Sequence, residues 1–127
     1  MAKRARAEHG SVSIVAAALM SVALVLAMGA ADLARVLTSA ARAQTAADAA
    51  ALAAAQELAA PSSLGLSPAE IAASYAARND AQLTACSCEA GGSEAVVTVR
   101  MSVGSLTFAP DDRVVTARAR AIVETPV

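Results

Sequence analysis

Residues 11–60 read SVSIVAAALMSVALVLAMGAADLARVLTSAARAQTAADAAALAAAQELAA, and this stretch decides the fold. From Gly10 to Ala31, 22 successive residues carry no charge, and about 20 apolar residues are enough to cross the hydrocarbon core of a bilayer. No Gly or Pro occurs from Ala30 to Ala60, so no local signal ends a helix at the membrane surface. The stretch therefore predicts one helix from Val12 to Ala59, only part of which fits in lipid.

The part of this helix beyond the span has one apolar face made mostly of small residues. Its members recur at steps of three and four residues: Leu33, Val36, Leu37, Ala40, Gln44, Ala47, Ala51, Ala55 and Leu58. Two coverings of this face remain open. In one, the C-terminal strands of the same chain cover the face; in the other, copies of the same helix pack on it. Each can apply to a different part of the helix.

Length and composition limit the rest of the chain to one small domain. The chain has 127 residues, and much of its 57% hydrophobic content is alanine. One Tyr, one Phe and no Trp leave few large side chains to anchor an interior. We therefore expect a thin domain that leans on the helix.

The charges are distributed unevenly about the apolar run. Lys3, Arg4 and Arg6 precede it, whereas the chain after Gly10 has seven Arg and ten acidic residues, a net charge of −3. Basic residues before a span predict a cytoplasmic N-terminus and an extracytoplasmic C-terminal domain in the cell membrane. Without a basic patch interleaved with aromatics, nucleic acid is not an expected partner.

A secretory signal peptide is the competing interpretation of the N-terminus. A charged segment, an apolar run and small residues at positions 29–31 fit its general pattern. The apolar run is longer than the usual ~7–15 residues. In that case the mature protein is a small secreted or membrane-tethered binding domain, which is the alternative function.

Local signals after Pro61 predict a second helix. Pro61 ends the first helix, and Ser67-Pro68-Ala69-Glu70 is a capping box with proline at the first helical position. This helix should run to Arg78 or Asn79, with Ile71 and Tyr75 on its buried side.

The remainder alternates between apolar and polar residues and predicts strands over 82–88, 95–103 and 113–124. Gly91-Gly92 forms the first turn. The connection over 104–112 carries Leu106 and Phe108, which we expect to fold back onto the long helix; a partner-binding tip is the alternative. The predicted fold class is α+β and pilin-like: a long membrane-spanning helix, a short helix and a small antiparallel sheet of about three strands.

The residues offer little catalytic chemistry. His9, the only histidine, lies before the span, so the C-terminal domain cannot build a Ser-His or Cys-His pair. Asp111 and Asp112 are adjacent and are interpreted as turn residues. Cys86 and Cys88 share one face of a strand, and three states remain open: a disulfide within the pair, one between chains, or two free thiols. We predict no enzyme activity, no metal site and no cofactor.

The run RAQTAADAAALA at residues 42–53, with Asp32-Leu33 upstream and Gly10-Ser11 before the span, resembles the N-terminal region of TadE/TadG-like proteins of tight-adherence (Flp) pilus systems. The short length and the TARARA ending of the last strand resemble most closely the small helicase/secretion-neighbourhood TadE-like proteins. The resemblance implies a prepilin whose leader a prepilin peptidase removes between Gly10 and Ser11. It also implies that the helix packs beside other pilin-like subunits on an assembly platform. Pilin-type proteins usually have Glu at the fifth position after cleavage, whereas Val15 stands here.

These observations together predict four segments: a leader or cytoplasmic tail (1–10), a transmembrane helix (11–31), its exposed continuation (32–60) and a small extracytoplasmic α+β domain (61–127). The predicted function is a non-enzymatic minor pilin-like or pseudopilin-like component of a Tad or related type II/IV secretion apparatus. Its helix packing face comprises Leu33, Leu37, Ala40, Gln44, Ala47, Ala51 and Leu58.

Overall fold

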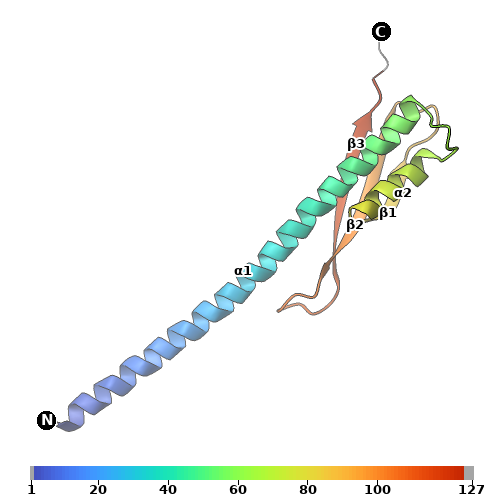
Figure 1. Cartoon of the computed structure of the whole chain (residues 1–127). Helices are drawn as coiled ribbons and strands as arrows, with labels where there is room; N and C mark the ends of the chain where they lie inside the picture. Colours follow the sequence, from blue (N-terminus) through green and yellow to red (C-terminus); the bar gives the residue numbers. More distant parts are fainter. Residues whose placement is uncertain (1, 125–127) are drawn as a thin grey trace.

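A computed structural model describes residues 2–124, with the side chains of residues 10–124. Its elements are α1 (Ala2–Ala59), α2 (Pro68–Arg78), β1 (Gln82–Ser87), β2 (Glu94–Gly104) and β3 (Arg113–Ile122). Figure 1 shows a long helical rod whose C-terminal part carries α2 and the sheet, while its N-terminal part projects freely. The predicted α+β class, with a long helix, a short helix and a three-stranded antiparallel sheet, is confirmed.

The long helix α1 begins earlier than the expected Val12, at Ala2. The sequence prediction started the helix at the apolar run, but the preceding Ala, Lys and Arg residues are themselves good helix formers. Gly10 and Gly29 lie inside α1 without ending it, since an isolated glycine costs a helix only about 1 kcal/mol relative to alanine. The helix thus runs continuously from the N-terminal segment into the folded domain.

The second helix starts where its capping box predicts. The Ser67 hydroxyl accepts the N–H of Glu70 at 3.3 Å, and the Glu70 carboxylate accepts the N–H of Ser67 at 2.7 Å. These hydrogen bonds satisfy backbone donors that an uncapped first turn leaves unpaired. The backbone N–H of Ser67 first, and then the Ser67 side chain, lower the pKa of the Glu70 carboxyl below its ordinary value.

The strands form an antiparallel sheet in the order β1-β2-β3, so β2 is central. Residues 89–92 make the first turn, where the N–H of Gly92 donates to the Glu89 carbonyl at 2.9 Å. The register shifts between Ser102 and Gly104, which leaves Val103 as a bulge. Gly104 follows with φ +79°, a conformation that glycine adopts readily. Pairing therefore ends here, and the chain leaves the sheet as the loop 105–112.

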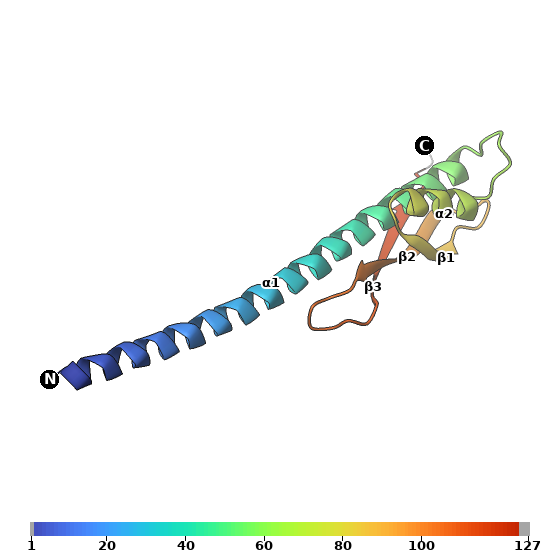
Figure 2. The same ribbon diagram turned by 60° about the horizontal axis from the view of Figure 1, so that its bottom comes forward.

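The core lies where the sheet and α2 pack on the C-terminal half of α1, as the views in Figures 1 and 2 agree. Val97 and Val99 of β2 are the largest fully buried side chains. The α1 contribution is almost entirely alanine: Ala43, Ala46, Ala47, Ala50, Ala51, Ala54 and Ala55. Small side chains let backbones approach closely but remove little apolar area each, so the domain depends on close packing along the helix.

The expectation that Tyr75 lies on the buried side of α2 is wrong. Tyr75 is 38% exposed, and the buried side chains of α2 are Ala72 and Ala76, while Ile71 is only partly buried. An alanine contact between α1 and α2 leaves no room for a phenol ring. The ring instead lies under the guanidinium of Arg78, 4.9 Å from its centroid, in a cation–π contact.

Candidate membrane and assembly surface

The N-terminal part of α1 exposes apolar side chains in every direction. Residues 11–28 are all exposed, and the large ones include Ile14 at 72%, Leu19 at 66% and Leu26 at 68%. A helix that is apolar all round is stable only inside lipid or between other helices. Its length and composition suffice to cross a membrane, and it is the single such helix in the described part of the chain. The chain is therefore suited to single-pass membrane anchoring.

The predicted packing face has two parts, one buried and one exposed. Ala47 and Ala51 are buried in the core that the folded domain forms on α1, and Leu58 packs at the edge of the same core. Leu33 and Leu37 are about 60% exposed (59% and 61%), and Ala40 is also exposed. The C-terminal part is thus covered by the protein's own domain, and the N-terminal part remains open to solvent.

Gln44 lies at the junction between these two parts. Its Nε2 donates to the Asp48 Oδ1 at 3.0 Å and to the carbonyl of Arg118 in β3 at 3.4 Å. The second bond ties α1 to an edge strand whose carbonyl has no further strand beside it. The side chain remains exposed, so it borders the open surface without closing it.

Asp32, the first charged residue after the apolar run, holds the loop 105–112. Its Oδ1 accepts the N–H of Thr107 and its Oδ2 accepts the N–H of Phe108, each at 3.0 Å. The side chain of Arg35 lies 3.7 Å away, and Asp32 itself is only 8% exposed. The backbone hydrogen bond from Thr107, followed by that from Phe108, lowers the pKa of the Asp32 carboxyl below its ordinary 3.8 despite the opposing effect of burial.

The sequence predicts that Leu106 and Phe108 fold back onto the long helix. The loop that carries them does so, but the Phe108 side chain does not. The loop does return to α1, yet the contact is made by backbone N–H groups, and the Phe108 side chain is 59% exposed. Leu106 is partly buried. In the sequence, Asp32 stands out only as part of a family pattern, which does not predict this contact. The only sequence feature that points to this contact is an acidic residue directly after the apolar run, and its partner Thr107 lies 75 residues away.

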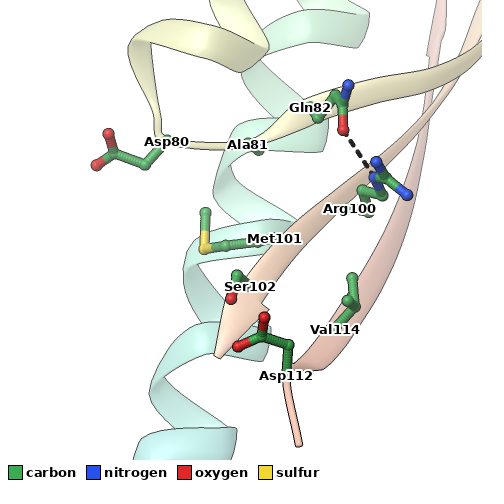
Figure 3. Close-up of a pocket in the computed structure, with 8 residues that line it drawn as sticks. All are labelled: Asp80, Ala81, Gln82, Arg100, Met101, Ser102, Asp112 and Val114. Atoms are coloured by element: carbon green, nitrogen blue, oxygen red, sulfur yellow. Dashed lines mark hydrogen bonds between the residues drawn. The ribbon is translucent and has the colours of Figure 1, made fainter. Parts of the chain in front are cut away.

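A cavity of about 430 Å³ lies among β1, β2, the start of β3 and the connection from α2 to β1 (Figure 3). Asp80, Arg100 and Asp112 line it, and Arg100 Nε donates to Gln82 Oε1 at 2.7 Å. The two carboxylates come from different connections and do not point toward each other in Figure 3. Within the described residues, no three His, Cys, Asp or Glu side chains are grouped to hold a metal ion. This cavity therefore presents no recognisable catalytic set.

The two cysteines lie at the end of β1, against the core. The structure joins Cys86 to Cys88 as a disulfide, with their Cα atoms 5.5 Å apart, a separation that disulfides commonly span. Cys88 is 9% exposed and belongs to the core cluster. Pairing within the chain is one of the three states that the sequence leaves open.

The remaining predicted site, Gly10-Ser11, lies within α1, and both residues are exposed. No side chain or distant backbone approaches the position of a Cβ at Gly10. This segment is thus accessible from all sides in the described chain.

Comparison with known families found one match. Residues 10–57 match the family model described as "Putative Flp pilus-assembly TadE/G-like". The match starts at Gly10 and ends within the last turn of α1, so it covers the apolar span and most of the α1 part of the core. It confirms the resemblance seen in the sequence. No curated protein and no solved structure matches the chain.

Proposed function

We propose that the chain is a minor pilin-like or pseudopilin-like membrane subunit without enzyme activity, because residues 10–57 match a family model related to Flp pilus assembly. One observation carries this proposal: the helix that bears the domain continues as an apolar rod exposed on every side. Such a rod serves both as an anchor in lipid and as a surface for neighbouring helices.

The proposed orientation has the N-terminus in the cytoplasm and the small domain outside. Lys3, Arg4 and Arg6 precede the span, and positive residues favour the cytoplasmic side. Residues 11–31 form the proposed transmembrane segment, and 32–60 and 61–127 the extracytoplasmic helix and domain.

Prepilin peptidase is the proposed processing partner, with cleavage between Gly10 and Ser11. The exposure of both residues supports access to this bond. Val15 then occupies the fifth position of the mature chain. An apolar residue there needs no charged partner inside lipid, which favours a tip, initiating or membrane-resident subunit over a major filament component.

Other pilin-like subunits and an assembly platform are the proposed partners. Their contact surface consists of the span together with Leu33, Leu37, Ala40 and Gln44. Leu33 and Leu37 support this because they are large apolar side chains left uncovered directly beyond the span. Ala47, Ala51 and Leu58 have a different task, since they attach the domain to α1.

The test is the N-terminal sequence and intact mass of the protein from native membranes. A start at Ser11 supports the proposal, and a Gly10→Leu variant should then retain its leader. A start near Asp32, with protein in the medium, overturns it in favour of a small secreted binding domain. An uncut chain in the membrane overturns the processing step and leaves a plain tethered domain.

A further inference from the structure

The loop 105–112 occupies a special position relative to the apolar span. Its backbone is bonded to Asp32, and Asp32 follows directly on the uncharged run that ends at Ala31. A carboxylate is strongly disfavoured in the hydrocarbon core, so Asp32 marks the level at which α1 leaves it. Figures 1 and 2 show this loop as the part of the folded domain nearest the N-terminal half of α1.

The fold fixes this position with three features. The bulge at Val103 and the positive φ of Gly104 turn the chain out of the sheet. The two hydrogen bonds to Asp32 then hold the loop against the helix. Finally, the N–H of Leu106 donates to the Ala109 carbonyl at 3.3 Å and closes the tip. The loop is therefore held at a defined height beside α1.

The tip presents an aromatic side chain at that height. Phe108, the only phenylalanine, is 59% exposed although its own N–H is held by Asp32. Exposure of the largest apolar side chain of a small domain has a cost in water. The cost disappears where the ring meets the boundary between lipid headgroups and acyl chains, a depth at which apolar and aromatic side chains of peripheral segments insert.

The charges around the tip do not favour anionic lipid. Asp32, Asp111 and Asp112 are acidic, and Arg35, Arg42 and Arg113 are basic, so the charges near the loop balance. A polybasic patch is the feature that attracts anionic headgroups. The contact must then rest on apolar insertion and form on zwitterionic lipid.

We propose that the loop 105–112 is a second membrane contact, in which Phe108 inserts into the headgroup–acyl boundary beside the emerging helix. A helix alone allows the domain to rotate and tilt over the bilayer. A second contact, joined to the first through Asp32, fixes which side of the domain faces away from the membrane. This inference rests on anchoring by the span and is independent of subunit assembly, so either proposal can fail without the other.

The chain has no Trp, so a Phe108→Trp variant places a single fluorescent probe at the tip. The full chain is reconstituted in phosphatidylcholine nanodiscs at one copy per disc, which removes contacts between subunits. Leu64→Trp is the matched control: Leu64 is 75% exposed, in the connection from α1 to α2. Ala59 lies 27 residues beyond Asp32, about 40 Å along the helix at ~1.5 Å per residue, so this control stays far from lipid.

We expect the Phe108→Trp variant to emit at shorter wavelength than the Leu64→Trp control and to lose most of its fluorescence when the lipids are brominated. The control should respond to aqueous iodide and not to brominated lipid. Adding phosphatidylglycerol should leave the emission of the Phe108→Trp variant unchanged, and combining this variant with Asp32→Asn should reduce its quenching by lipid. The proposal is overturned if the two variants behave alike, or if the blue-shifted emission of Phe108→Trp is unaffected by brominated lipid, since a protein contact then covers the probe.

Discussion

The carboxylate of Asp32 accepts the backbone N–H of Thr107 at 3.0 Å, across 75 residues of sequence. With the neighbouring bond from Phe108, this contact joins the end of the apolar span to the tip of the longest loop of the sheet. Charge-assisted hydrogen bonds to carboxylates are stronger than those between neutral groups. The contact thus joins the end of the apolar run to the part of the domain nearest the N-terminal half of α1, outside the alanine core.

Asp32→Asn should release the loop without unfolding the domain. The variant keeps one acceptor oxygen and replaces the other with an amide NH₂, which cannot accept the second N–H. Amide hydrogen exchange at Thr107 and Phe108 should become faster, while exchange at Val97 and Val99 stays slow. Asp111→Asn is the control, because Asp111 is exposed in the same loop. Equal exchange in the wild type and in Asp32→Asn would remove the structural role assigned to Asp32.

The same contact should depend on pH. Because the folded state lowers the Asp32 pKa from its ordinary 3.8, the ionised carboxylate stabilises the contact fully above that ordinary value. This stabilisation is lost as the pH falls through the lower, folded-state pKa. The amide NMR signal of Thr107 should therefore titrate with a midpoint below 3.8. In Asp32→Asn this titration should be absent.

Ala47→Leu should destabilise the domain. Ala47 is fully buried in the core cluster, so the added carbons force a shift that typically costs about 1–3 kcal/mol. Ala41→Leu is the matched control on an exposed position of the same helix, where surface changes usually stay within about 0.5 kcal/mol. Thermal unfolding of detergent-solubilised protein measures both. A Tm for Ala47→Leu equal to that of Ala41→Leu would contradict the packing described for α1.

Leu33→Ala combined with Leu37→Ala should leave stability nearly unchanged but reduce association of the chain in membranes. Both side chains are about 60% exposed (59% and 61%), so their loss creates no cavity, whereas a neighbouring helix loses its contacts. Leu52→Ala is the control, because Leu52 is 56% exposed on the domain-bearing part of α1. Crosslinked species resolved after membrane extraction measure the effect. Unchanged crosslinking in the double variant would exclude these leucines from the assembly surface.

Much of the architecture could be predicted because its signals are local. An unbroken apolar run, the Ser67–Glu70 capping box and the alternation of β2 each specify an element through residues that are neighbours in sequence. The capping box even fixed the start of α2 at Pro68. Helix termini without such a signal cannot be read from the sequence in this way, and α1 extends back to Ala2 because helix propensity, not hydrophobicity, governs its first turns.

By itself the sequence determined that this chain has a membrane-length helix continuous with a small-residue face, because charge, hydropathy and helix period are properties of neighbouring residues. The tertiary structure alone decided that Ala47 is buried in the core and that Leu37 is left exposed, since that depends on how far the folded domain reaches along α1. It also decided that Asp32 binds the loop at Thr107 and Phe108. Backbone N–H groups carry no side-chain signature, so only the folded arrangement reveals which carboxylate they meet.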